Sequence, residues 1–376
     1  MKKRLISILT MLAFLVSFLL ANYFSDHGIS LHAQLNKGIH WIESLFGEDI
    51  VLDKSPANIS EHTIAQEKPK KLYPHVEVGK IKACKDTSLG EAKYKKVGEV
   101  FTWIDERGIA NFSSTSPNKG EFKVINYAGE KVFDYFTLDL NTESLPYDFY
   151  QKLTLKLNKL FEVYGQLLDR PSLKKVDINL RVHASKLTFN KIKAKHNMPI
   201  SDNTLGFYSH VSNQAHLLLI NHESTMRTAI HEAAHAINRG IIGYSPKWLN
   251  EGLAEYSEYI EIKGQSNRVY PNQNWTRKGV VLEPLLPLDE LLSANKSDWD
   301  STIKNRLYAT SWAFIYFMLD NQQRKDMLAK VIKYEQQNLC DVIGIKQVEN
   351  IIGIPIEELQ NQFSYWSSRR LRIHNI

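Results

Sequence analysis

Two histidines spaced four residues apart carry the most specific chemical signal in the sequence. They belong to the segment His231-Glu232-x-x-His235, in which both intervening residues are alanine. On a helix, positions i and i+4 share one face with Cβ atoms about 6 Å apart, so both imidazoles can reach a single metal ion. Glu232 lies one position round the helix, which suits a carboxylate that takes a proton from water at the metal. The alternative is an ordinary helix whose histidines are core or surface residues.

A third ligand is expected on the next helix. Glu251 follows His235 after fifteen intervening residues. A catalytic zinc uses three protein ligands and an open position, and two histidines with one glutamate are a known set. Glu255 lies one turn beyond Glu251, where it is expected to accept the second ring N–H of a ligand histidine. The alternative is a solvated acidic face that continues through Glu258 and Glu261.

Taken together, the two segments resemble the site motifs of gluzincin zinc peptidases, of which thermolysin is the type. The run Asn250-Glu251-x-x-Ala254-Glu255, within Trp-Leu-Asn-Glu-Gly-Leu-Ala-Glu-Tyr at 248–256, is similar to bacterial peptidase MA-like families. The resemblance spans about 135–320. It implies one Zn²⁺ ion held by three ligands, which are His231, His235 and Glu251. It also implies that Glu232 is the general base, and that Asn250 and Glu255 support the ligands.

The same resemblance implies peptide-bond hydrolysis. Zinc lowers the pKa of its bound water to roughly 7, and Glu232 takes the proton and later returns it to the leaving amine. Similar families supply an oxyanion donor downstream, and Tyr308, in the run Tyr-x-x-Ser-Trp at 308–312, is our candidate. A packing role for Tyr308 remains open, and three other tyrosines compete with it: Tyr244, Tyr256 and Tyr259.

Hydrophobic periodicity predicts an α+β domain over 133–376, with a small mixed sheet, the histidine-bearing helix and a helical C-terminal part. The resemblance implies that this is a zincin-like catalytic domain. Strands are expected at 136–140, 176–182, 206–211 and 215–220, the last two forming a hairpin. Helices are expected at 147–168, 224–239, 247–261, 302–319, 322–337 and 355–372. Ser245 is expected as an N-cap with Pro246 in the first turn. By resemblance, strand 215–220 is the edge strand that holds an extended peptide or protein substrate.

A signal anchor is predicted at residues 1–25. Lys2, Lys3 and Arg4 precede an apolar stretch from Leu5 to about Ala21, and a basic segment before an apolar one directs export. We expect an uncleaved, single-pass helix in a bacterial inner membrane with the catalytic domain in the periplasm. Secretion after cleavage is the alternative. Residues 26–75 are interpreted as an amphipathic stretch and linker.

A small β module is predicted at residues 76–132. Strands at 101–104 and 109–112 flank a turn that ends in Gly108. The pattern aromatic-x-Trp-x-Asp-x-x-Gly, followed by an aromatic residue and by Ser near Pro, resembles a short module near the N-terminus of many exported bacterial proteins. The resemblance implies export and assigns no chemistry.

Composition removes several functional classes. The chain has 376 residues, 43% of them hydrophobic and 23% charged, which excludes a polytopic membrane protein and a disordered chain. A net charge of +6 does not indicate a nucleic-acid partner. Two cysteines, Cys84 and Cys340, exclude a thiolate-rich zinc site, and whether they pair is open.

These observations favour a membrane-anchored zinc metallopeptidase. The alternatives are a catalytically silent binding protein with a zincin fold, and a zinc hydrolase that acts on a non-peptide amide. Three further histidines near the predicted hairpin are not expected to bind metal or substrate: His210, His216 and His222.

Overall fold

The computed structural model describes residues 86–96, 99–117, 121–126, 131–142, 144–198, 204–264, 266–282, 284–339 and 343–376. The predicted anchor, the amphipathic stretch and both cysteines lie outside these residues. All of the described residues belong to one compact unit, Leu72–Ile376. Within the described residues, none of the helices combines the length and apolar character that a membrane span requires.

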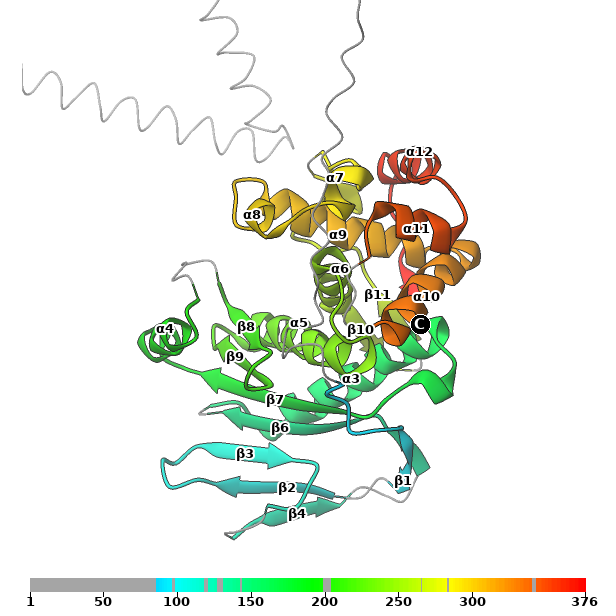
Figure 1. The fold of residues 1–376 in the computed structure, drawn as a ribbon. Helices are drawn as coiled ribbons and strands as arrows, with labels where there is room; N and C mark the ends of the chain where they lie inside the picture. The colour runs from blue at the N-terminus through cyan, green and yellow to red at the C-terminus, as the bar shows by residue number, and fades with distance from the viewer. Residues whose placement is uncertain are drawn as a thin grey trace, which may run out of the picture. The chain divides into compact units, whose positions relative to one another are not determined.

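A mixed seven-stranded sheet forms the base of this unit, in the order β4-β2-β3-β6-β7-β9-β8 (Figure 1). Strands β6, β7 and β9 pair in parallel, and the other neighbours pair antiparallel. The strands are β2 (Glu99–Ile104), β3 (Ala110–Ser113), β4 (Lys123–Asn126), β6 (Phe136–Thr142), β7 (Val176–His183), β8 (Gly206–Ser209) and β9 (Gln214–Leu218). The expected mixed α and β architecture is therefore confirmed, with a larger sheet than the sequence suggested.

The predicted hairpin is formed by β2 and β3. Gly108 has a φ of 79°, a conformation that favours glycine, and the Asp105 carboxylate accepts the backbone N–H groups of Arg107 and Ile109. Strand β3 continues into the main sheet by pairing with β6. The boundary that we expected at 132, between the small β module and the catalytic domain, therefore separates strands that belong to one sheet. Beside it, β1 (Lys93–Lys96) pairs with β5 (Lys131–Asp134) as a separate two-stranded ladder.

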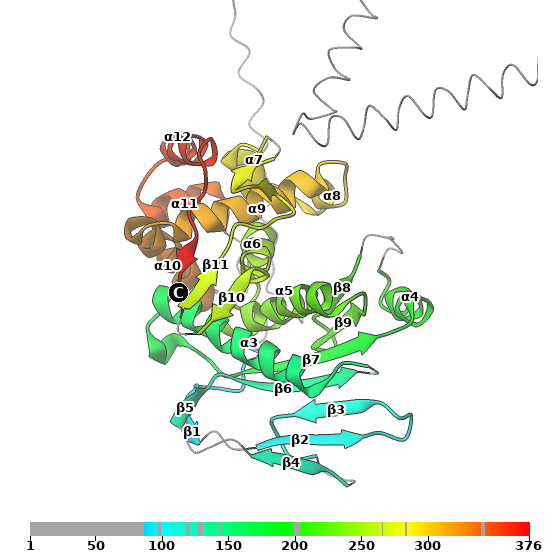
Figure 2. The same ribbon diagram turned by 180° about the vertical axis from the view of Figure 1, so that it is seen from behind.

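Alternation along the central strands separates an apolar face from a polar face. Leu140 and Leu180 are fully buried on the face covered by α3 (Tyr147–Leu167) and α5 (His222–Ile241), as Figures 1 and 2 show. Their strand neighbours are only partly buried, so that buried and half-buried residues alternate along β6. One side of the sheet therefore packs against the helices, and we call the other side its far face.

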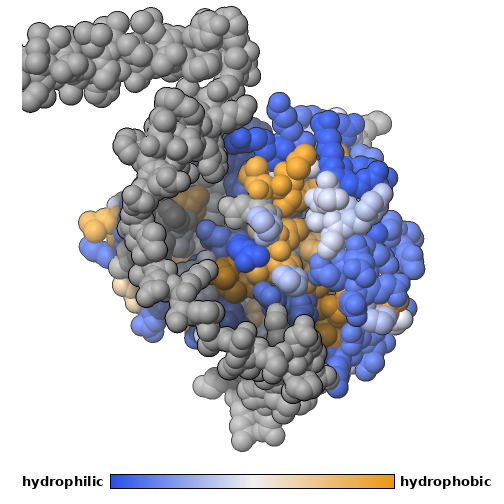
Figure 3. Space-filling view, turned by 90° about the horizontal axis from the view of Figure 1, so that it is seen from above, coloured by the Kyte–Doolittle hydropathy of each residue, from blue (hydrophilic) through white to orange (hydrophobic). Residues whose placement is uncertain are grey.

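Helices dominate the C-terminal half. The long elements are α6 (Lys247–Ser257), α9 (Lys304–Leu319), α10 (Gln322–Gln337) and α12 (Ile356–Ser367). The shorter helices are α4 (Lys186–Lys195), α7 (Leu288–Leu292), α8 (Lys296–Trp299) and α11 (Ile345–Ile352), with a 3-10 turn at Arg170–Ser172. Seen from above, this end of the unit shows a group of hydrophobic residues bordered by hydrophilic ones (Figure 3).

Helix α6 lies unusually close to α9 at Gly252. A Cβ atom there would come within 2.6 Å of both the Ser311 carbonyl oxygen and Ile315 Cγ1. Only glycine fits this contact without a shift. Gly252, the residue after Glu251, therefore allows α6 to pack closely against α9.

Several predicted boundaries differ from the structure. The helix expected at 247–261 ends at Ser257, because Ile260–Lys263 forms β10 and pairs with β11 (Ser266–Val269). The helix expected at 355–372 ends at Ser367, and the chain returns as β14 (His374–Asn375) beside β11. A small ladder joins β12 (Thr276–Arg277) and β13 (Val280–Val281).

Proline positions also differ from the expectation. Pro246 is the N-cap of α6, with ψ at 145°, and Lys247 is the first helical residue. Ser245 therefore lies outside the helix. Pro355 caps α12 in the same way, because its extended backbone suits the N-cap position.

The strand order corrects the expected substrate edge. Strand β9, within the predicted 215–220, pairs with β7 on one side and β8 on the other. It is an internal strand. Among the described residues, β8 is the last strand of the sheet and pairs only with β9. The parallel crossover through α4 inserts β9 beside β7, which leaves β8 outermost.

Candidate metal centre

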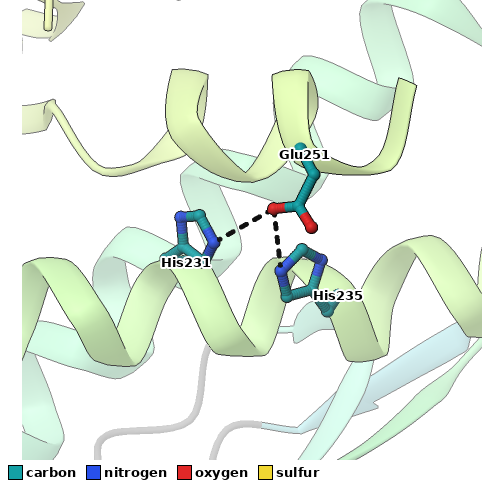
Figure 4. Close-up of side chains that lie close together, drawn as sticks. All are labelled: His231, His235 and Glu251. Carbon is teal, nitrogen blue, oxygen red and sulfur yellow. Dashed lines mark ion pairs between the residues drawn. The ribbon is translucent and has the colours of Figure 1, made fainter. Parts of the chain in front are cut away.

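Two helices supply the candidate ligands. Helix α5 begins after Asn221, whose side chain accepts the Ser224 N–H at 2.8 Å. It carries His231 and His235 one turn apart, and α6 crosses it with Glu251 in its second turn. Figure 4 shows the two rings on one helix and the carboxylate on the other, with one oxygen facing both rings.

The distances fit a shared ion. Glu251 Oε2 lies 3.6 Å from His231 Nε2 and 3.5 Å from His235 Nε2. These separations are long for hydrogen bonds, but two ligands each about 2.1 Å from a tetrahedral ion are separated by roughly 3.4 Å. Glu251 Oε2 is also buried without a hydrogen-bond partner. The three residues form a group that can hold a metal ion.

Charge at the centre is consistent with a bound cation. Burial disfavours the ionised form of Glu251, but the two imidazoles and Lys247 outweigh it and lower its pKa to about 2. Burial lowers the pKa of His235 to about 4, so its ring is neutral and keeps a lone pair for a metal. Burial also opposes a charge on His231, but the neighbouring carboxylates of Glu251 and Glu258 raise its pKa well above the usual value. A bound cation would compensate the same carboxylates.

Each ligand ring is oriented through its other nitrogen. His231 Nδ1 lies 2.7 Å from Glu258 Oε1, and His235 Nδ1 lies 3.1 Å from Asn250 Oδ1. With Nδ1–H donating to these oxygens, both Nε2 lone pairs face Glu251. Asn250, expected beside the ligands, is therefore in place.

Glu255 does not take the role that we expected. Its Oε2 accepts hydrogen bonds from Asn272 Nδ2 and Trp275 Nε1, each at 2.8 Å. The partner of the His231 ring is Glu258, one turn later, which we had assigned to a possible solvated face. Glu258 follows Glu251 by seven residues, or two helical turns, and that spacing was the available signal for a shared face. Glu255 and Glu251 are only 6% and 7% exposed, which excludes a solvated acidic face for them.

A buried polar chain supports the ligand His235 from behind. Asn250 Oδ1 also accepts from Asn238 Nδ2 at 2.8 Å. Asn238 Oδ1 in turn accepts from the Tyr164 hydroxyl on α3. The chain joins α3, α5 and α6, and two of its members, Tyr164 and Asn238, are almost fully buried. The sequence offered no signal for it, because Tyr164 lies 74 residues before Asn238.

Glu232 adjoins the edge strand. Its side chain is 5% exposed, and its Oε2 is buried without a hydrogen-bond partner. A Cβ atom on Gly206 of β8 would lie 2.8 Å from Glu232 Oε1, so only glycine allows this approach. Burial raises the pKa of Glu232 to about 8, with His231 opposing and Glu251 adding to the shift. Such a carboxyl can both accept and return a proton near neutral pH.

Tyr308 approaches the centre from α9. Burial raises the pKa of its hydroxyl, and the carboxylates of Glu251, Glu232 and Glu255 raise it further. The hydroxyl is therefore a protonated donor close to these groups. The ring packs edge-on against Trp299, with centroids 5.3 Å apart, so Tyr308 has a packing role as well.

Two of the competing tyrosines, Tyr256 and Tyr259, contact other residues. The Tyr256 hydroxyl lies 3.1 Å from His374 Nδ1. The Tyr259 ring lies 5.7 Å from the guanidinium of Arg227. Glu251 and Glu232 are among the groups that raise the pKa of Tyr308, whereas the carboxylates that raise the pKa of Tyr259 are Glu258 and Glu255.

The three other histidines occupy different places. His216 lies on the far face, with its Nδ1 3.2 Å from His183 Nε2. His222 is exposed at the start of α5. His210 packs edge-on against Tyr208 at 5.0 Å, and the Tyr208 ring is 6.5 Å from that of His235. Of the three, only His210 approaches the metal centre.

Comparison with known proteins gives one match. A family model described as a protein of unknown function (DUF1570) matches residues 225–338. This range contains every ligand named above together with Glu232 and Tyr308, and it excludes the β2–β3 hairpin. No curated protein matches the chain. The match delimits the part of the chain that holds the metal centre and assigns no reaction to it.

Proposed function

We propose that this protein is a zinc-dependent peptidase of the gluzincin type with a zincin-like catalytic domain. One observation carries the proposal, namely the buried, partnerless Glu251 Oε2 between two Nε2 atoms, with Glu232 beside them. Two imidazoles and one carboxylate suit zinc, whereas magnesium and calcium prefer oxygen ligands alone. His231, His235 and Glu251 would hold the ion.

The proposed reaction assigns a task to each nearby side chain. Zinc, when bound, acts as a Lewis acid toward a carbonyl and lowers the pKa of water to roughly 7. Glu232 takes a proton from the attacking water, whose oxygen bonds to the carbonyl carbon. The carbon–nitrogen bond then breaks, and Glu232 returns the proton to the leaving amine. Burial raises the pKa of Glu232 above that of an ordinary carboxyl, which makes its carboxylate a stronger base. Tyr308 donates a hydrogen bond to the oxyanion.

The free edge of β8 supports a peptide as substrate. An extended chain can add to an unpaired strand edge through main-chain hydrogen bonds, without a demand for particular side chains. Gly206 lies in this strand against Glu232. A peptide paired with β8 therefore passes the proposed general base, and β8 replaces 215–220 as the proposed substrate strand.

We also propose that the N-terminal segment anchors the protein in the inner membrane with its catalytic domain in the periplasm. The basic residues before an apolar stretch support this proposal. Protease added to intact spheroplasts should digest the catalytic domain, whereas digestion only after lysis would place it in the cytoplasm.

Metal analysis paired with a peptide-library digest tests the proposed function directly. The full-length chain should contain close to one zinc per molecule and should cleave peptides in a manner that a chelator abolishes and zinc restores. Zinc without cleavage would instead support a silent binding protein. Cleavage of small amides but not of peptides would support a non-peptide hydrolase.

A further inference from the structure

The far face of the sheet contains a pocket that the metal centre does not use. Its volume is about 260 Å³, and strands β2, β3, β6 and β7 contribute to it. The residues that matter for its chemistry are Trp103, Ser113, Thr137, Asp139, Asp177 and Asn179. Residues of β6 and β7 alternate between the two faces, so the pocket lies opposite the helices.

The signature of the β2–β3 hairpin converges on this pocket. Trp103, Ser116 and Pro117 belong to the sequence pattern for which no role was assigned, and all three line the pocket. The pairing of β3 with β6 brings them beside the carboxylates of the main sheet. The β2–β3 hairpin thus contributes its Trp, Ser and Pro residues to a pocket that also contains the polar groups of β6 and β7.

The two carboxylates in the pocket differ in their partners. Asp139 forms an ion pair with Arg181 at 2.8 Å. Asp177 accepts hydrogen bonds from the Thr137 hydroxyl, from Asn179 Nδ2 and, at 3.5 Å, from Asn213 Nδ2, and all three donors are neutral. In the part of the chain that the structure describes, no lysine or arginine forms an ion pair with Asp177. Its charge is held in a fixed orientation and is uncompensated.

We propose that this pocket binds a primary ammonium group, from a lysine side chain or from a small free amine. Asp177 supplies the counter-charge, and the Trp103 indole supplies an aromatic wall that attracts a cation. The hydroxyls of Thr137 and Ser113 offer further acceptors for N–H donors. The volume lies below the range of about 300–1,000 Å³ typical of drug-sized ligands, which suits a single amine-bearing chain.

Calorimetric titration of the full-length, zinc-loaded chain tests this site. Two probes carry an ammonium group, N-acetyl-lysine amide and cadaverine, and N-acetyl-norleucine amide is the uncharged control. We expect the amines to bind and norleucine not to bind. Tighter binding of the lysine derivative would identify a peptide source, and tighter binding of cadaverine would identify a free amine. Equal binding of the norleucine control, or no binding of either amine, would overturn the proposal.

Variants locate the binding site within the pocket. Asp177→Asn and Trp103→Leu should each weaken amine binding by about tenfold, since each removes one source of attraction for the cation. Asp326→Asn removes one negative charge from the exposed surface of α10 and should change nothing. If Asp177→Asn disturbs folding, Trp103→Leu decides the matter, with zinc content as the check on fold. Unchanged affinity in a folded Trp103→Leu variant would contradict the assignment.

Discussion

The molecule contains two histidine clusters that differ in their acidic neighbours. In the metal centre, His231 and His235 face Glu251, and each ring is oriented by a side-chain oxygen. The second group, which we call the far-face histidine cluster, consists of His183, His196 and His216. Its rings lie close, with centroids of His196 and His216 5.3 Å apart. None of the metal-compatible groups found among the described residues includes a member of this cluster.

Charge explains the difference between the clusters. Burial lowers the pKa of His216 to about 4, and the neighbouring histidines, Arg181 and Lys195 lower it further. A positive environment repels a cation, whereas the carboxylates of the metal centre attract one. Histidines in contact do not by themselves make a metal site. A buried carboxylate with an unsatisfied oxygen is what distinguishes His231 and His235.

Removing that carboxylate should have the largest effect. Glu251→Ala takes away one of three ligands, so we expect zinc affinity and peptide hydrolysis to fall by more than about 100-fold. Zinc content after dialysis and single-substrate kinetics measure the two effects. Glu261→Ala, on β10, is the matched control and should retain zinc. Full zinc occupancy in Glu251→Ala would mean that the third ligand is another residue.

Glu232→Gln should separate metal binding from chemistry. The amide keeps the shape of the side chain but cannot accept a proton, so we expect hydrolysis to fall by about 10²–10⁴-fold. Zinc content should stay the same, because Glu232 is not a proposed ligand. A loss of zinc equal to the loss of activity would show that Glu232 coordinates the ion.

The two clusters also show which features a sequence can specify. The spacing of His231 and His235 fixes their shared face, because a helix repeats every 3.6 residues. The motif around Glu251 indicated the second helix, and the structure places all three together. The far-face cluster was not predicted, since His183, His196 and His216 meet only when α4 folds back on β7 and β9.

Details that depend on how one helix is rotated against another were not predictable. Glu255 and Glu258 lie three residues apart on α6 and its C-cap, and only the packing of α6 on α9 at Gly252 decides which one reaches His231. Likewise, the edge position of β8 follows from the crossover through α4, which periodicity cannot reveal. The Tyr164–Asn238 contact joins two helices that are distant in sequence.

Comparing Glu258→Gln with Glu255→Gln sharpens the account of the metal centre. Loss of a carboxylate that orients a ligand histidine typically costs 10–100-fold in metal affinity. We expect about that loss for Glu258→Gln and a smaller loss for Glu255→Gln, whose oxygen is bonded to Asn272 and Trp275. Competition with a zinc-binding dye measures both. A larger loss of zinc affinity in Glu255→Gln than in Glu258→Gln would instead support Glu255 as the residue that orients a ligand histidine.

The far-face histidine cluster should make stability depend on acid without any metal. The pKa of His216 is lowered from 6.5 to about 4 in the folded state, so between these values the unfolded chain binds more protons than the native one. Stability is therefore retained above pH 6.5 and lost as the pH falls toward 4. We expect a loss of roughly 2 kcal/mol, less than the full shift would give because solvent reaches part of the cluster.

Urea unfolding of the metal-free protein at pH 7 and pH 4.5 measures this loss. His216→Leu removes the titrating ring and should make the pH dependence shallower by about that amount. His222→Leu is the matched control, because it removes a histidine ring that is exposed at the start of α5. If both variants keep the slope of the wild type, the acid sensitivity arises from other groups. The protonation of His216 would then not account for the loss of stability in acid, and the lack of nearby carboxylates would be the remaining difference between the far-face cluster and the metal centre.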